Sequence, residues 1–273
     1  MSLVPIGASI TAGYEAGHGL PFDSDGMKER YPGIFFSQFT GAELMAEKWN
    51  LSREDLDKFA LSSHQKAAAA VEGKYFDREI LPIQAKNAEG KTDMVFNDEG
   101  IRYDASFEAL SGLNPVTEGG VITAGNASQI TDGAAALMIC NDEGLKKVKA
   151  DPRARIVGIS VVGDDPIMML GGPIPASHKV LKATNLNIND VDIYEVNEAF
   201  APVPLSWAIE LKADMARLNV NGGAMALGHP LGATGAKLMT TMLHELERTN
   251  GKYGLQAICE GGGTANATII ERI

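Results

Sequence analysis

The chain has 273 residues, which suits about two domains and is long enough to bury a sizeable core. Its net charge of −11 argues against nonspecific nucleic-acid binding, which needs a basic surface. No apolar run approaches the ~20 residues of a membrane span. Because two cysteines form no disulfide framework, no Cys/His cluster has zinc-ligand spacing and the N-terminus lacks a signal-peptide pattern, the sequence predicts a cytoplasmic protein without metal.

The first 125 or so residues contain short helical stretches separated by Gly, Pro and Asp/Asn turns. The strongest pattern predicts a helix over residues 52–73, because Ser52 precedes an acidic first turn and an apolar face follows. A second helix is expected over residues 41–49. Residues 86–113 are charged, rich in turn formers and weakly periodic.

The character of the sequence changes at about residue 121. We expect a helix over Ser128–Ala136 that leads into a short apolar strand over Leu137–Cys140. Cys140 lies within that strand, so we interpret it as a structural residue.

From Ala154 onward, strand and helix patterns alternate, which is typical of a layered α/β domain. No G-x-G-x-x-G loop follows a strand, so nicotinamide chemistry has no support. The expected strands are 156–162, 191–196, 253–259 and 266–270, and the expected helices are 176–184, 199–210 and 232–248.

Three reactive groups in the last 80 or so residues each lie beside glycine-rich backbone. They are Asn197 in the run NEAF, His229 in the run NVNGGAMALGHPLGATG, and Cys259 in the run CEGGG. A thiol and an imidazole can form a proton-transfer pair, and exposed glycine amides can face a developing oxyanion. Taken singly, each group also fits a structural role: a helix N-cap, a satisfied histidine and a small buried hydrophobe.

His229 is the histidine with the most distinctive setting. It stands between Gly228 and Pro230, just before a predicted helix whose positive N-terminal end favours neutral imidazole. Neutral imidazole can take a proton from a thiol. The other four histidines have no comparable setting and are interpreted as surface or packing residues: His18, His64, His178 and His244.

Together, and in this order, the NEAF, GGxxxLGHPxGxxG and CxGGG segments resemble signatures of the thiolase family, which makes or breaks carbon–carbon bonds between acyl-CoA thioesters. The resemblance implies a loop domain over residues 1–125, the last helix and strand of an N-terminal domain over 126–150, and the layered C-terminal domain over 151–273. It implies an acyltransferase of the kind that acts in fatty acid β-oxidation. Acyl-CoA and CoA would be substrates, with no separate cofactor.

The resemblance also assigns roles to residues of the predicted site. His229 would activate the nucleophilic cysteine and contribute to an oxyanion hole, and Cys259 would move a proton to or from the α-carbon of the acyl group. Asn197 would orient a water molecule toward the thioester oxygen. The remaining candidates are Gly261, whose N–H would hold the acyl oxygen, Ser128 near the pantetheine, Arg102 near the nucleotide, and Phe39 in the acyl pocket.

Two departures from the family pattern qualify this expectation. Gln38-Phe39-Thr40 stands where many thiolases have a His-Met-Gly-like segment, which leaves room for a longer or bulkier acyl group. Thiolases also carry a preceding stretch with the nucleophilic cysteine, and this chain starts after it. We therefore expect the chain to be inactive alone and interpret it as part of a thiolase, because losing the nucleophile of a coupled catalytic unit costs on the order of 10⁶ in rate.

Three functional hypotheses stay open at this point. The first is a thiolase-type acyltransferase, thiolytic or condensing, that is active only when its N-terminal half is supplied; we expect a homo-oligomer or a partner that supplies the missing half. The second is a non-catalytic subunit that binds acyl-CoA or assembles with a full-length thiolase. The third is a thioester hydrolase that uses Cys259 as nucleophile and His229 as base.

Overall fold

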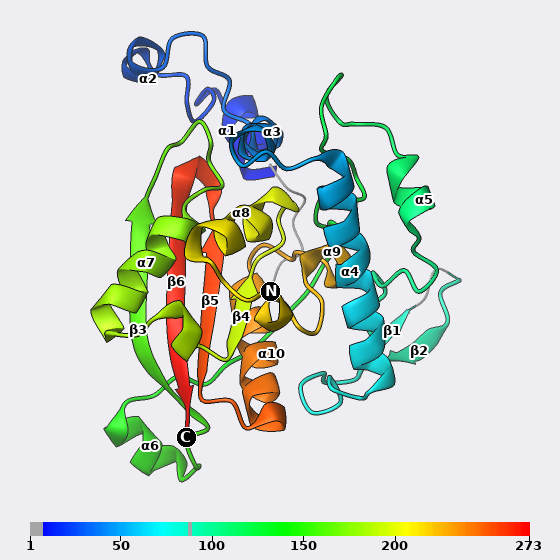
Figure 1. Cartoon of the computed structure of the whole chain (residues 1–273), viewed down its shortest axis with the longest axis vertical. Helices are drawn as coiled ribbons and strands as arrows, with labels where there is room; N and C mark the ends of the chain where they lie inside the picture. Colours follow the sequence, from blue (N-terminus) through cyan, green and yellow to red (C-terminus); the bar gives the residue numbers. More distant parts are fainter. Residues whose placement is uncertain (1–7, 87–88) are drawn as a thin grey trace.

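The computed structural model describes residues 8–86 and 89–273 (Figure 1). Its centre is a four-stranded sheet in the order β3-β6-β5-β4. Strands β4 and β5 run parallel, and the β5–β6 and β6–β3 pairs are antiparallel. All four residues of β4 are buried, as expected for a strand covered on both faces. The strands are β3 (Ala154–Gly163), β4 (Ile193–Val196), β5 (Tyr253–Cys259) and β6 (Thr264–Arg272).

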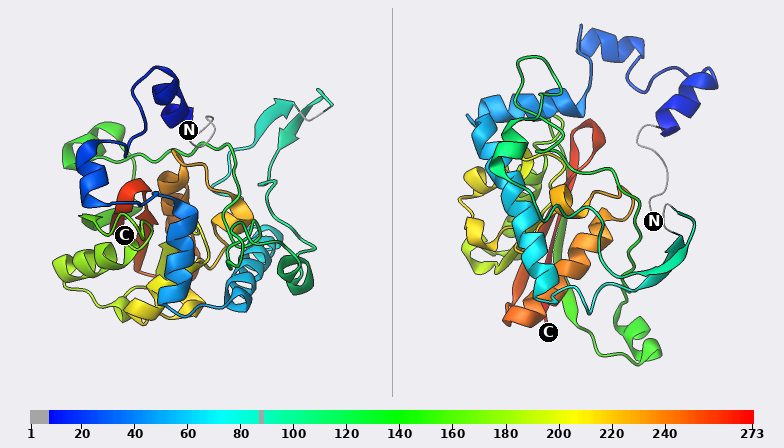
Figure 2. Two further views of the ribbon diagram at one scale, coloured as in Figure 1. Left: turned by 90° about the horizontal axis from the view of Figure 1, so that it is seen from above. Right: turned by 90° about the vertical axis from the view of Figure 1, so that its right-hand side faces the viewer.

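Helices cover both faces of this sheet. α7 (Pro173–Thr184) packs on β3 and β6, and α8 (Pro202–Leu211) packs beside it. α10 (Thr234–Thr249) packs on β4 and β5 from the opposite face. Figures 1 and 2 show these layers, which confirm the layered α/β expectation. The two prolines in the first turns of α8 delay its start to Pro202, three residues later than the apolar pattern suggested.

The main core lies between the sheet and the α7–α8 layer. Trp207 of α8 is fully buried, and its indole Nε1–H donates a hydrogen bond to Ser177 Oγ of α7 at 2.8 Å. The ring of Tyr194 in β4 lies 5.3 Å from the Trp207 ring. These aromatic contacts join α7 and α8 to β4, the strand that leads into the NEAF turn.

The N-terminal part surrounds this domain with helices and one hairpin. The hairpin of β1 and β2 projects from the body of the molecule (Figure 2). The elements of the N-terminal part are α1 (Ala8–Glu15), α2 (Asp25–Arg30), α3 (Gln38–Lys48), α4 (Arg53–Glu72), β1 (Ile83–Lys86), β2 (Thr92–Val95), α5 (Phe107–Ser111) and α6 (Asp142–Val148). The C-terminal part adds the short helix α9 (Ala224–Leu227) and 3₁₀ turns at Ile188–Asp190, Met215–Arg217 and Gly261–Gly263.

α4 begins where the sequence predicted. Ser52 and Asp55 form a capping box in which each side chain accepts from the backbone N–H of the other residue. Arg53 then donates to Asp57 and to the carbonyl oxygen of Leu110 in α5, which ties α4 to α5. α4 packs against both α5 and α9.

The segment over residues 128–140 differs from the sequence prediction, since the expected helix and strand do not form. Ile130, Met138 and Ile139 are more than 70% exposed. The apolar pattern of this segment is that of a buried strand, but none of the described strands lies beside it to supply the hydrogen bonds that a strand needs.

No described helix combines the length and apolar character that membrane crossing requires. No group of three or more His, Cys, Asp or Glu side chains among the described residues is arranged to hold a metal ion.

Candidate active site

Two of the three reactive segments lie at one edge of the sheet. Asn197 follows the last residue of β4, and Cys259 is the last residue of β5. Because these neighbouring strands are parallel, their carboxyl ends meet at the same edge. The backbone N–H of Asn197 donates to the carbonyl oxygen of Ala257 at 3.0 Å, two residues before Cys259.

The third segment brings His229 to Asn197. The backbone N–H of His229 donates to the Gln129 carbonyl oxygen at 3.0 Å, which anchors the loop before α10. His229 Nε2 lies 3.2 Å from Asn197 Nδ2. Gly228 just before it has φ +77°, and a Cβ there would overlap with Thr131, so only glycine allows this approach.

The hydrogen bonds around His229 define its tautomer. Its Nδ1 lies 2.6 Å from Thr234 Oγ1, and Thr234 Oγ1 donates its hydrogen to the Pro230 carbonyl oxygen at 3.0 Å. Since the hydroxyl hydrogen is used, Nδ1 carries the proton and donates to Thr234. Nε2 is then the unprotonated nitrogen, and it accepts from the Asn197 amide. A lone pair therefore lies on the Asn197 side of the ring.

Burial keeps this imidazole neutral. Burial and, to a smaller extent, the nearby Lys237 cation together lower the pKa of His229 from an ordinary 6.5 to about 4. The direction agrees with the sequence prediction, but burial is the main cause rather than the following helix. At neutral pH, His229 is thus a neutral base whose Nε2 lone pair accepts from the Asn197 amide.

Burial shifts the pKa of Cys259 in the opposite direction from that of His229. Cys259 is buried, and burial raises the pKa of its thiol to about 12, with a smaller contribution from Glu260. At neutral pH the group is a thiol that can give up a proton only to a strong base. The backbone beside it is open: nothing lies within 4 Å of the position that a Cβ on Gly261 would take. The site thus combines a neutral base, an amide and a protonated thiol.

Glu198 organises the loops around the site. Its buried carboxylate accepts from Ser63 Oγ of α4 at 2.7 Å, from Asn219 Nδ2 at 2.9 Å and from the Met225 N–H of α9 at 3.1 Å. These bonds tie the NEAF turn to the glycine-rich run and to α4. Burial nevertheless raises the pKa of Glu198, because the desolvation of its charge outweighs these bonds.

The substrate-binding candidates lie in different places. The Ser128 N–H donates to the Ala199 carbonyl oxygen at 3.0 Å, which places Ser128 beside the NEAF turn. Phe39 of α3 packs edge-on against Phe200 of that turn, with ring centroids 5.4 Å apart. Arg102 instead lines an open groove of about 480 Å³ beside α4, together with His64, Gln65, Glu72 and Tyr103. None of the contacts in the described part of the chain joins Arg102 to His229 or Cys259.

Sequence reasoning missed two groups of this site. Thr234, which fixes the tautomer of His229, lies five residues downstream at the start of α10. Its position in GHPLGAT was the available signal, because a hydroxyl at a helix start is placed to bond backbone or side-chain groups nearby. Lys237 is the other, and its buried ammonium donates to the Leu227 carbonyl oxygen at 2.6 Å.

The depressed pKa of His229 predicts how stability depends on pH. Between pH 6.5 and about 4 the unfolded chain binds a proton on His229 that the folded chain does not, so stability falls as the pH is lowered through this window. The expected loss from this residue is about 3 kcal/mol. Urea unfolding of the wild type and of His229→Asn at pH 7 and pH 4 measures it. The variant should lose clearly less stability than the wild type, and parallel losses would contradict the assignment.

These features place a neutral imidazole, an amide and a protonated thiol around the carboxyl edge of a layered α/β sheet. The family model "Thiolase, N-terminal domain" matches residues 4–143, and "Thiolase, C-terminal domain" matches residues 150–272. The chain therefore belongs to the thiolase family.

Individual relatives support the same assignment. The chain is 50% identical to the steroid 3-ketoacyl-CoA thiolase FadA6 of Mycobacterium tuberculosis over 274 aligned residues, which cover 100% of this chain and 66% of that protein. It is 46% identical to the mitochondrial 3-ketoacyl-CoA thiolase of Bos taurus, over 84% of this chain and 58% of that protein. The chain thus spans under two thirds of the length of these relatives.

Solved structures agree with the fold. The acetyl-CoA acetyltransferase of Bacillus anthracis is similar with a TM-score of 0.84 and 40% identity, over 89% of this chain and 61% of that chain. The human mitochondrial 3-ketoacyl-CoA thiolase in complex with CoA is similar with a TM-score of 0.78 and 40% identity, over 86% of this chain and 58% of that chain.

Proposed function

We propose that this chain is the proton-transfer part of a thiolase-type acyltransferase that cleaves 3-ketoacyl-CoA with CoA, or condenses two acyl-CoA molecules in reverse. The observation that carries the proposal is the contact between neutral His229 and Asn197 at one edge of the sheet. Cys259, whose thiol is protonated, is the last residue of the neighbouring strand at the same edge. The names of the relatives point to the same reaction.

His229 and Cys259 carry out different proton transfers in this reaction. A cysteine thiol from another polypeptide segment attacks the 3-keto carbon while His229 Nε2 accepts its proton. The bond between C2 and C3 then breaks, and C2 takes a proton from Cys259 to give acetyl-CoA. The acyl group stays on the attacking sulfur, and the proton on His229 returns to the Cys259 thiolate. The sulfur of CoA then attacks the acyl carbon while His229 takes the CoA thiol proton and passes it to the departing cysteine sulfur. A thiol of high pKa suits the second step, because the carbanion at C2 is a stronger base than the thiolate.

The same thiol argues against the hydrolase hypothesis. With a pKa of about 12, on the order of one Cys259 in 10⁵ would be a thiolate at pH 7. The thiolate is the nucleophilic form, so Cys259 is poorly suited to capture an acyl group directly. It is well suited to hold a proton for transfer.

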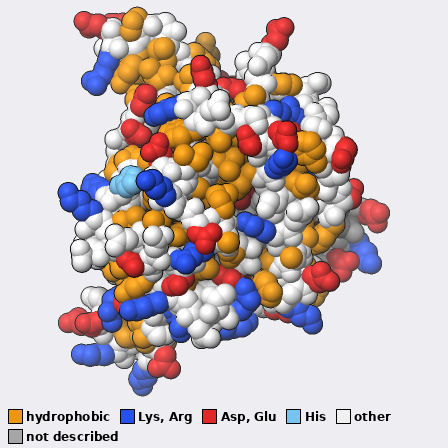
Figure 3. Space-filling model, viewed as in Figure 1, with side chains coloured by type: hydrophobic (Ala, Val, Ile, Leu, Met, Phe, Trp, Pro, Cys, Tyr) orange, Lys and Arg blue, Asp and Glu red, His pale blue; other side chains and the backbone are white. Residues whose placement is uncertain are grey.

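Apolar surface supports the need for an additional polypeptide segment. Ser160 of β3 points toward α7 and donates to the Ala176 carbonyl oxygen, whereas Ile159 and Val161 on the other face are at least 60% exposed. The exposed apolar residues of 128–140 add to this surface. Figure 3 shows the opposite side of the molecule, where α7 and α8 lie in Figure 1, and hydrophobic side chains gather in the middle of that side too. Surface of this kind is typical of a protein interface, and we propose that an N-terminal segment like that of longer thiolases covers it. Homo-oligomerisation and the cytoplasmic setting stay predictions.

We further propose a bulky acyl group as the substrate. Phe39 packs on Phe200 at the NEAF turn, which supports its role as a wall of the acyl pocket. The relative that is 50% identical is named as a steroid thiolase, which favours a bulky ring system over a short chain.

The test is to restore the segment. The N-terminal part of the Mycobacterium tuberculosis relative, up to the start of the matching region, is fused before Met1 of this chain. We expect CoA-dependent release of acetyl-CoA from 3-ketoacyl-CoA by the fusion and none by the chain alone, measured by chromatography of the CoA thioesters.

The control is the same fusion with the cysteines of the added segment replaced by alanine, which should be inactive. A folded fusion that binds 3-ketoacyl-CoA saturably but releases no acetyl-CoA would contradict the proposal and favour a non-catalytic binding subunit.

A further inference from the structure

A small enclosed cavity lies directly behind the Asn197–His229 pair. Glu195, Asn197, Thr234 and Lys237 supply polar groups to its wall. The space open to the centre of a water molecule is about 10 Å³, which is room for about one water. Asn197 and Thr234, the two hydrogen-bond partners of the His229 ring, therefore both line this cavity.

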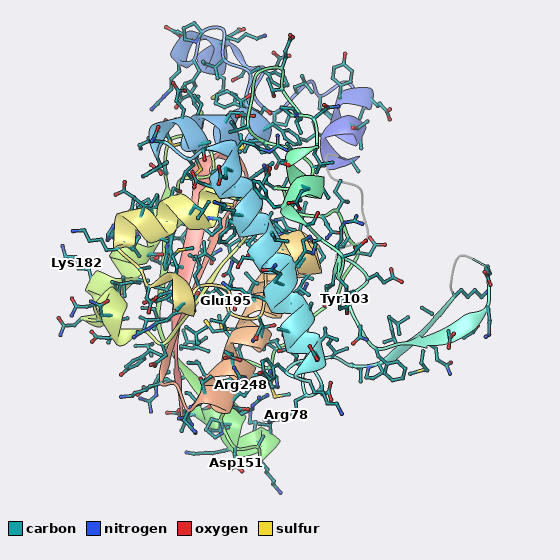
Figure 4. The ribbon with its side chains drawn as sticks, turned by 45° about the vertical axis from the view of Figure 1, so that its right-hand side comes forward. Arg78, Tyr103, Asp151, Lys182, Glu195 and Arg248 are labelled. Carbon is teal, nitrogen blue, oxygen red and sulfur yellow. The ribbon has the colours of Figure 1, made fainter. Side chains whose placement is uncertain are left out.

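Glu195 is the unusual group in this wall. It comes from the middle of β4 and is fully buried, and Figure 4 shows it in the interior of the molecule near α10. Neither carboxyl oxygen accepts a hydrogen bond from the described part of the chain. Its register partner on β5 is Gln256, which is also buried and whose Oε1 likewise accepts no hydrogen bond from the described residues.

The local balance of donors and acceptors favours the acid form of Glu195. The Asn197 Oδ1 is a further buried oxygen without a donor from the described chain, so the acceptors outnumber the donors around the cavity. A protonated carboxyl group turns one acceptor into a donor. An ionised carboxylate here would be costly, because a buried charge needs close partners.

The charges around Glu195 act in the same direction. Burial raises its pKa well above the ordinary value, and the carboxylates of Glu198, Glu79 and Glu245 raise it further. Lys66 of α4 opposes this effect. Lys237 of α10 also faces the cavity, but burial lowers the pKa of its own ammonium, and that ammonium already donates to the Leu227 carbonyl oxygen.

We propose that Glu195 is a positioning residue that acts, as a neutral acid, through the Asn197 amide on His229. Its hydroxyl donates, through the one water that the cavity can hold, to Asn197 Oδ1. That bond turns the Asn197 Nδ2 toward His229 Nε2 and thereby keeps the lone pair of the base on the reactive side. This inference rests on the proposed function for its kinetic consequence, but the tautomer of His229 can be measured without turnover.

The first experiment measures that tautomer by ¹⁵N NMR of histidine-labelled protein at pH 7. The wild-type His229 should carry its proton on Nδ1, and Glu195→Gln, which keeps a donor of the same shape, should preserve this state. Glu195→Leu removes the donor and should populate the Nε2-protonated tautomer. If the folded Glu195→Leu protein keeps the wild-type tautomer, the proposal is wrong.

Infrared spectroscopy tests the acid form even if Glu195→Leu fails to fold. The wild type at pH 7 should show the carbonyl band of a protonated carboxylic acid, shifted in D₂O and missing in Glu195→Gln. If no such band distinguishes the two proteins, Glu195 is ionised and the proposal is overturned.

Kinetics of the completed enzyme provide the last readout. Glu195→Leu should lower kcat on the order of 10-fold or more with little change in KM, because a misplaced base affects the chemical step rather than binding. Glu195→Gln should rescue most of this loss. If the completed enzyme is inactive, the proposed function fails, while the NMR and infrared results still decide the role of Glu195.

Discussion

Replacing Cys259 with alanine in the completed enzyme is expected to reduce CoA-dependent cleavage of 3-ketoacyl-CoA by on the order of 10²- to 10⁴-fold, the usual contribution of a positioned proton donor. The reason is that burial raises the pKa of this thiol to about 12. At neutral pH the thiol therefore holds the proton that the departing C2 carbanion needs. Alanine has a similar size and leaves the strand end in place, so the effect should fall on kcat.

A half-reaction separates this role from a structural one. Exchange of an acyl group between acyl-CoA and free CoA forms and breaks only thioesters, so it does not use a proton at C2. Cys259→Ala should therefore keep exchange near the wild-type rate while it loses cleavage. The matched control is Cys140→Ala, which removes the chain's other cysteine, an exposed one. Equal losses of cleavage in both variants, or equal losses of exchange and cleavage in Cys259→Ala, would rule out the assigned role.

Replacing Gly223 with alanine is expected to destabilise the protein by about 3–5 kcal/mol, because it combines overpacking with broken buried hydrogen bonds. A Cβ at this position would overlap with the carboxyl group of Glu198. That carboxylate cannot move away without losing Ser63, Asn219 or the Met225 N–H. The site should loosen along with the fold, since the same carboxylate holds the NEAF turn.

Urea unfolding measures this loss. The matched control is Gly163→Ala at the end of β3, where nothing lies within 4 Å of the added Cβ and where the change should cost little. A Gly223→Ala protein as stable as the Gly163→Ala protein would mean that the Glu198 network is not rigid.

The strands and helices of the C-terminal part were largely predictable, because their patterns are local. β5 has the predicted bounds, since its mostly apolar run ends at Cys259, just before Glu260 and the three glycines. α4 begins at the predicted cap, because Ser52 and Asp55 are neighbours in sequence. The segment 128–140 was not predictable in the same way, since an apolar run becomes a strand only when another strand lies beside it.

The sequence by itself determined which reactive groups the protein carries, that they lie beside flexible glycine backbone, and the family to which the chain belongs. Only the tertiary structure decided how those groups pair. The parallel register of β4 and β5 brings Asn197 and Cys259 to one edge, and the loop before α10 brings His229 to the Asn197 amide. The protonation states of His229 and Cys259 follow mainly from burial, which is a property of the packed molecule. In water the same imidazole and thiol would have ordinary pKa values.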